Sequence, residues 1–138
     1  MKRVKIRTVT TGVVLSRGAP RPEWRTVLER AAEFNKAAVG AYEAAGFVVQ
    51  TSRIATNPFE EYVDASDRVA ALDAFSFIDA VLLEVCGEHA MFNAGPARSD
   101  AGVALVADLV TLPGGRICAS AELQQNAAPR ALDIAHVI

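Results

Sequence analysis

The sequence contains little that would mark a membrane, secreted or nucleic-acid-binding protein. No apolar run approaches the roughly 20 residues that a membrane-spanning helix requires. The 14 basic residues are scattered among 16 acidic ones, for a net charge of -2, so we expect neither a membrane nor a nucleic-acid partner. The two cysteines, Cys86 and Cys118, are far apart and lack metal-ligand spacing. They predict two reduced, mostly buried thiols in a cytoplasmic protein.

Motifs for metal, nucleophile or phosphate chemistry are also missing from the sequence. No HxxxH, HxH or CxxC spacing occurs, and no GxSxG turn places a serine nucleophile. Gly114-Gly115 precedes a strand-like segment, whereas a phosphate-binding loop precedes a helix. His89 lies at the expected end of a helix and has no second histidine at metal-ligand spacing. We therefore expect no metal site, and the sequence leaves the cofactor open.

The composition and periodicity that are present indicate one α/β domain. Apolar residues make up 51% and charged residues 22% of the chain, which suits a single domain over residues 1–138 with a sizeable core. Strand-like and helical patterns alternate along the sequence. Strands are predicted at 4–15, 47–54, 91–94 and 116–121, and helices at 22–45, from 64 or 66 to 89, 100–112 and from 126 or 127 onward.

Helical crossovers of this length join parallel strands, so the pattern predicts an α/β fold with a mostly parallel sheet. Four strands leave such a sheet open, because a closed α/β barrel takes about eight. The last helix is apolar up to Ile138 and has no polar cap. We therefore expect an incomplete part of a larger α/β barrel, the amino-terminal portion of a longer domain. The helix residues expected to be buried are Trp24, Leu28, Phe34, Leu72 and Leu82.

Polar residues follow the last three predicted strands. Ligands of parallel α/β folds bind at the carboxyl ends of the strands. Arg53 and Arg98 at these ends predict a subsite for a small anion, either a carboxylate or a phosphate. The residues expected near one common edge of the sheet are Thr11, Asn57, Asn93 and Ser120. The candidate ligand-binding residues are Arg53, Thr56, Asn57, Asn93, Arg98, Ser120 and Glu122.

The residues after the second strand also have a structural interpretation. Arg53 can pair with Glu60 or Glu61, as isolated charged residues near strand ends often do. Asn57, which precedes a proline, is a turn signal, because its side chain can replace a backbone group in a turn. The sequence leaves a structural role and a ligand-binding role open for both residues.

The same holds for the residues after the third and fourth strands. Gly95-Pro96 is expected to end the third strand, which would leave Asn93 and Arg98 in a solvated loop. Glu122 can serve as a general base, pair with Arg98 or be an ordinary surface carboxylate.

Four short segments occur in a characteristic order: IRTVT at 6–10, QTSRIATNPF at 50–59, EVC at 84–86 leading to NAGPA at 93–97, and RICAS at 116–120. Together they resemble the amino-terminal part of the domain-of-unknown-function 711 family, and the segment from Arg53 to Phe59 is the most specific. The resemblance covers nearly the whole chain and implies a fold grouped with the pyruvate formate-lyase-like barrels. It does not imply radical chemistry, because a fold does not determine a function. The family has no assigned activity, so the resemblance transfers no catalytic residue.

Two functional hypotheses follow. The first is a ligand-binding or catalytic α/β domain that holds a small anionic molecule at the carboxyl ends of its strands. The second is a non-catalytic structural or regulatory module that forms a homo-oligomer, since open sheet edges invite pairing with another chain. Convergence of Arg53 and Arg98 favours the first hypothesis, and a large apolar surface on the last helix favours the second.

Overall fold

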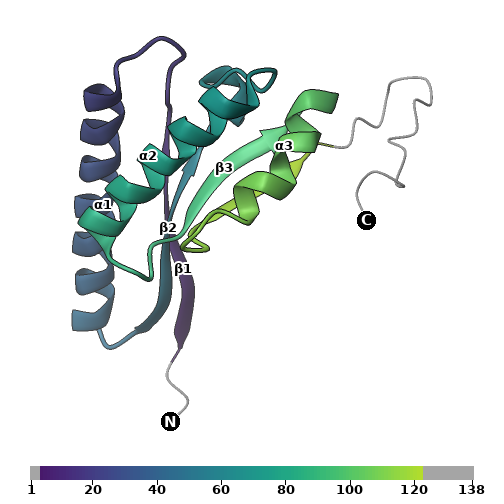
Figure 1. Ribbon diagram of the computed structural model, residues 1–138. Coiled ribbons are helices and arrows are strands. Elements are labelled where there is room, and N and C mark those ends of the chain that lie inside the picture. Colours follow the sequence, from purple (N-terminus) through teal and green to yellow (C-terminus); the bar gives the residue numbers. More distant parts are fainter. Residues whose placement is uncertain (1–3, 123–138) are drawn as a thin grey trace.

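The computed structural model describes residues 4–122, in which strands and α-helices alternate. All neighbouring strands are parallel, and the order in the sheet is β1-β2-β3-β4 (Figure 1). The α/β fold with alternating βα units is thereby confirmed. These strands leave the sheet open, so the larger barrel stays a prediction, and the predicted fourth helix lies outside the described residues. The elements are β1 (Lys5–Val13), α1 (Arg21–Ala44), β2 (Val48–Thr56), the short 3-10 helix η1 (Phe59–Glu61), α2 (Arg68–Cys86), β3 (Phe92–Ala97), α3 (Asp100–Val110) and β4 (Ile117–Ala121).

The three α-helices form one layer over one face of the sheet. Helix α1 packs on β1 and β2, α3 packs on β3 and β4, and α2 contacts both α1 and α3 (Figure 1). Right-handed crossovers between strands that are neighbours in sequence and in space put every helix on the same side. The other face of the sheet carries no helix within residues 4–122. The largest fully buried core side chains include Phe59, Phe75, Ile78, Leu82 and Phe92.

Strand β3 continues through Gly95-Pro96 to Ala97, so the prediction that this dipeptide ends the third strand is wrong. The register between β3 and β4 shifts between Asn93 and Pro96, as it does at a β-bulge. Gly95 has a φ of 78°, in the region that favours glycine. A Cβ atom there would lie 2.6 Å from the carbonyl oxygen of Asn57. The bulge therefore accommodates the proline, and the glycine lets β3 pass close to the end of β2.

The four residues expected near one common edge lie at different depths in the sheet. Asn57 directly follows β2, and Ser120 is the penultimate residue of β4. Thr11 is level with Ile54 in mid-sheet, because β1 continues beyond it to Val13. Asn93 is the second residue of β3 rather than one of its last, because β3 is longer than predicted.

Among the helix residues expected to be buried, the prediction for Phe34 is wrong, because 63% of this residue is exposed. The neighbouring Asn35 occupies the inward position instead and is 4% exposed. Successive residues of an α-helix differ by about 100° around the axis, so only one of the two can face the sheet. Leu72 is partly buried. The remaining predictions are confirmed for Trp24, Leu28 and Leu82.

Candidate functional site

Arg98 at the carboxyl edge of the sheet is held by two carboxylates. Its Nη1 lies 2.9 Å from Oε1 of Glu61, and its Nε lies 2.7 Å from Oε2 of Glu122. The hydrogen bond with Glu122 is the main cause that raises the pKa of the Arg98 guanidinium above its ordinary value. Of the alternatives for Glu122, the structure contains the ion pair with Arg98. The charge of Arg98 is therefore already balanced by carboxylates of this chain.

Glu60 takes a different position from the one considered in the sequence. Its carboxylate accepts hydrogen bonds from the backbone N–H groups of Arg98 and Ser99 and from the Ser99 hydroxyl, at the start of α3. A Cβ atom at Gly102 would lie 2.6 Å from this carboxylate, so the glycine leaves room for it. Neither Glu60 nor Glu61 forms an ion pair with Arg53 among residues 4–122, although local pairing was one expectation for Arg53.

Asn57 and Thr56 join segments of the protein to one another. The side chain of Asn57 accepts a hydrogen bond from the backbone N–H of Leu15 at 3.0 Å and donates to the Leu15 carbonyl oxygen at 3.1 Å. The Thr56 hydroxyl lies 3.0 Å from the hydroxyl of Tyr62, which donates to the Ala94 carbonyl oxygen at 3.2 Å. Burial raises the pKa of Tyr62. These contacts give Asn57 a structural role, but they join the end of β2 to the distant Leu15 and are not those of a local turn.

Toward the middle of the strands, the sheet face without helices carries small and polar side chains. Gly12, Ala55, Asn93 and Cys118 are in register and form one row across the four strands. Side chains alternate along a strand, and the neighbouring Ile54 is buried in the core on the helix side. The row therefore lies on the face without helices. By the same alternation, the other residues of this face near the row include Thr8, Thr10, Thr51, Arg53 and Ser120.

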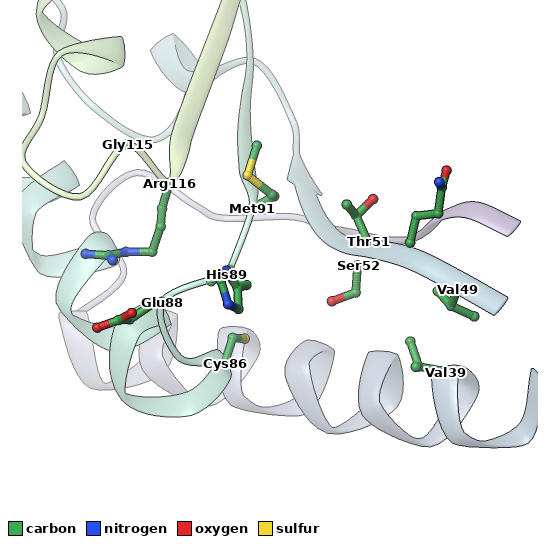
Figure 2. Close-up of a pocket in the computed structure, with 12 residues that line it drawn as sticks. Val39, Val49, Thr51, Ser52, Cys86, Glu88, His89, Met91, Gly115 and Arg116 are labelled. Carbon is green, nitrogen blue, oxygen red and sulfur yellow. The ribbon is translucent and has the colours of Figure 1, made fainter. Parts of the chain in front are cut away.

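Contacts at β2 agree with this assignment of the two faces. The hydroxyl groups of Thr8 and Thr51 lie 2.9 Å apart on the face without helices. In Figure 2, Thr51 and Ser52 project to opposite sides of β2, with Ser52 on the side of α1. Parallel strands that are covered on both faces read as nearly continuous apolar runs. Strands β1 and β2 instead carry polar residues on both faces: Thr11 and Ser52 lie on the helix side, and Thr10 and Arg53 lie on the other side.

Arg53 is the cationic residue of this polar face near the row. Its Nε is buried and has no hydrogen-bond partner within the described part of the chain. Buried donors without a partner are rare in native proteins and cost about 1–3 kcal/mol each. Arg53 and Arg98 therefore differ in state: the Arg98 guanidinium has two carboxylate partners, and the Arg53 Nε has an unused donor.

Asn35 on α1 supports Arg53 from the helix side of the sheet. Its Nδ2 donates to the carbonyl oxygen of Arg53 at 2.9 Å, and its Oδ1 accepts from the Thr11 hydroxyl at 2.7 Å. The sequence analysis did not identify this residue. The available signal was a polar residue in the apolar stripe of α1, seven positions after the buried Leu28, which is the spacing of two helical turns.

The remaining two candidates lie on the polar face but differ in their contacts. Oδ1 of Asn93 accepts a hydrogen bond from the backbone N–H of Gly95 at 3.0 Å, which stabilises the bulge. Ser120 is paired in register with Pro96 on the other side of that bulge. In the same row as Asn93, the Cys118 thiol donates to the Phe92 carbonyl oxygen at 3.3 Å.

A cavity of about 470 Å³ lies beside the amino ends of β3 and β4 and reaches Ser52, the residue before Arg53. It is bounded by the start of β2, the end of α2 and the segments before β3 and β4 (Figure 2). None of the seven candidate ligand-binding residues lines it. Cys86 and His89 line it, and burial raises the pKa of the Cys86 thiol. Arg116, another lining residue, is already bound through two nitrogens to Asp79, at 2.8 and 2.6 Å.

Residues 4–122 contain no group of three or more His, Cys, Asp or Glu side chains arranged to hold a metal ion. Over the same residues, no helix combines the length and the apolar character needed to cross a membrane. Both cysteines of the chain are free thiols, but the prediction that both are mostly buried is wrong, because Cys86 is exposed and Cys118 is only partly buried.

Comparison with known proteins gives one match. No curated protein and no solved structure matches the chain. The model of one protein family matches residues 1–129, which is most of the sequence and includes all seven candidate residues. The chain therefore belongs to the family described as "Uncharacterised ACR (DUF711)".

Proposed function

We propose that this protein binds a small anionic molecule on the polar face of its sheet, with Arg53 as the cationic contact. Arg53 lies one residue before the level at which β3 begins, and the proposed site extends from it toward the carboxyl ends of the strands. The observation that carries the proposal is the buried Arg53 Nε, which has no partner within the described residues. A cation with an unused donor is the group to which an anion binds most favourably.

The other candidate residues either add polar groups to the proposed site or hold the surrounding structure in place. Asn93 and Ser120 contribute polar groups to the same face as Arg53. Arg98 and Glu122 form the rim as an ion pair, and Thr56 and Asn57 hold β2 in place through their contacts with Tyr62 and Leu15. The expectation of two converging arginines thus becomes a proposal with one arginine, since Arg98 is already paired.

The chemistry of the polar face favours a ligand over a packed protein layer. A face that packs against another apolar layer needs large apolar side chains, because burial of apolar area drives packing. The row across this face instead consists of Gly12, Ala55, Asn93 and Cys118. We also propose a cytoplasmic location, which the two free thiols support.

Thermal unfolding in the presence of anions tests the proposal. Sodium phosphate, sulfate and acetate are each compared with sodium chloride at equal ionic strength. A ligand at roughly 100 times its Kd stabilises the folded state by about 2.7 kcal/mol, so the melting temperature should rise by several degrees. The gain should disappear in Arg53→Gln. It should remain in Arg25→Gln, which removes a positive charge on α1 that is paired with Glu84. Equal gains in the parent and in Arg53→Gln would overturn the proposal.

A homo-oligomer is the second candidate, and one observation favours it. Edge strand β1 and helix α1 border a groove of about 400 Å³ that includes Val14 and Phe34. These two residues are 70% and 63% exposed. Exposed apolar groups beside an open sheet edge are suited to contact with another chain. Light scattering should then give a mass above that of one chain, and Phe34→Glu should lower it. A single-chain mass at high concentration would contradict this candidate.

A further inference from the structure

We propose that the anion is a small carboxylate, held side-on by Nε and one terminal nitrogen of Arg53. This inference rests on the proposed function and specifies the chemical class of its ligand. Three features of the protein support it: the way its other arginines bind carboxylates, the charge available on the polar face, and the size of the residues beside Arg53.

Side-on pairing is how this protein binds its own carboxylates at two places. Arg68 donates from Nε and Nη2 to the two oxygens of Asp108, both at 2.7 Å. Arg116 donates from the same two atoms to Asp79, at 2.8 and 2.6 Å. In each pair, two parallel N–H groups match the two oxygens of a planar carboxylate. Nε is one of these two donors, and it is the donor that Arg53 leaves unused.

The charge balance favours a carboxylate over a phosphate. A carboxylate carries one negative charge, whereas a phosphate group carries about -1.5 to -2 near neutral pH. Within residues 4–122, the polar face offers the one charge of Arg53, because Arg98 is paired with Glu61 and Glu122. The same edge also carries the Glu60 carboxylate at the start of α3. A second negative charge on the ligand would therefore meet carboxylates rather than a second free cation.

The residues beside Arg53 indicate a small ligand with further polar groups. Gly12 and Ala55 lie one row farther along the strands, and their small size leaves space above the sheet at that point. Thr10 is in register with Arg53, and Asn93 is in register with Ala55, so a hydroxyl and an amide flank the arginine. These groups suit a short carboxylate that also bears a hydroxyl or a carbonyl. Because Nε is buried, side-on binding requires a rotation of the Arg53 side chain that exposes it.

Lactate and phosphate are the two probes for this inference, with chloride at equal ionic strength as the reference. In the unmodified protein, lactate should raise the melting temperature and phosphate should add nothing beyond chloride. Arg53→Lys keeps the positive charge but has no paired N–H groups, so we expect its Kd for lactate to rise about tenfold or more, which corresponds to about 1.4 kcal/mol. Arg25→Lys is the matched control and should bind lactate as the parent does.

Nuclear magnetic resonance of the arginine Nε–H groups gives an independent readout. Lactate should shift the Arg53 signal and leave those of Arg68 and Arg116 in place, because their Nε donors are already occupied. Phosphate that stabilises as well as lactate, in a manner dependent on Arg53, would overturn the carboxylate inference and leave the proposed anion site standing. Full lactate affinity in Arg53→Lys would overturn the side-on geometry. No anion effect at all would overturn the proposed function itself.

Discussion

Replacement of Asn35 by alanine should destabilise the protein strongly, although Asn35 is a polar residue on a helix with solvent on its other side. Asn35 is 4% exposed and joins α1 to two strands through its bonds with the Thr11 hydroxyl and the Arg53 carbonyl oxygen. Alanine cannot form either bond. A hydroxyl and a carbonyl group would then be left without these partners beneath the helix layer.

The expected size of the effect follows from these two bonds. A buried polar group left without its partner costs about 1–3 kcal/mol, so we expect a total loss of about 2–4 kcal/mol. A typical urea m-value for a small domain is about 1–3 kcal/mol per M, so the unfolding midpoint should fall by roughly 1–2 M. The m-value itself should not change, because the fold that unfolds is the same.

A double-mutant cycle with Thr11→Val separates this mechanism from a general loss of packing. Thr11→Val alone removes the donor to Asn35 and should destabilise, whereas in the double variant the orphaned hydroxyl no longer exists. The double variant should therefore be more stable than the sum of the single effects implies, by about 1 kcal/mol. Urea unfolding followed by circular dichroism measures all four proteins. Strictly additive effects, or an unchanged midpoint for Asn35→Ala, would refute the reasoning.

Two further predictions concern packing and pH. Leu28→Ala should lower the free energy of unfolding by about 2–5 kcal/mol, because Leu28 is fully buried. Phe34→Ala on the same helix should change it by less than about 1 kcal/mol, because Phe34 is exposed. Equal urea midpoints for the two variants would contradict the assignment of the inner face of α1. The hydrogen bond from Arg68 lowers the pKa of the Asp108 carboxyl below its ordinary value. This pair therefore stabilises the fold above the unfolded-state pKa of about 4, and the contribution disappears as the pH falls through the lowered folded-state value. A carboxyl titration by nuclear magnetic resonance should show this pKa rising toward its ordinary value in Arg68→Gln, and an unchanged value would exclude Arg68 as the cause.

Local patterns in the sequence determined most of the secondary structure. Period-2 and helical spacing placed the four strands and three helices, and the connections between them made a parallel sheet the expected arrangement. The buried positions of Trp24 and Leu28 followed from the same spacing. These features depend on residues that are close in sequence, so a single sequence is sufficient to predict them.

Interactions between distant residues decided what the sequence analysis missed. Gly95-Pro96 is a stop signal in isolation, but pairing with β4 on both sides of a bulge keeps it within β3. Arg98 was a candidate for an external anion until the fold brought it to Glu61 and Glu122, which are 37 and 24 residues away. Such partners cannot be identified from spacing along the chain.

The two faces of the sheet also separate what the local sequence determines from what the tertiary structure determines. The sequence by itself determined which residues of a strand share a face, because side-chain direction alternates along any strand. Only the tertiary structure decided which face the helices cover, and thus that Arg53 lies on the face without helices while Asn35 supports it from the other side. The physical reason is that hydrogen bonding and burial depend on distances in space, and the chain fixes those distances only after the crossovers have brought separate strands together.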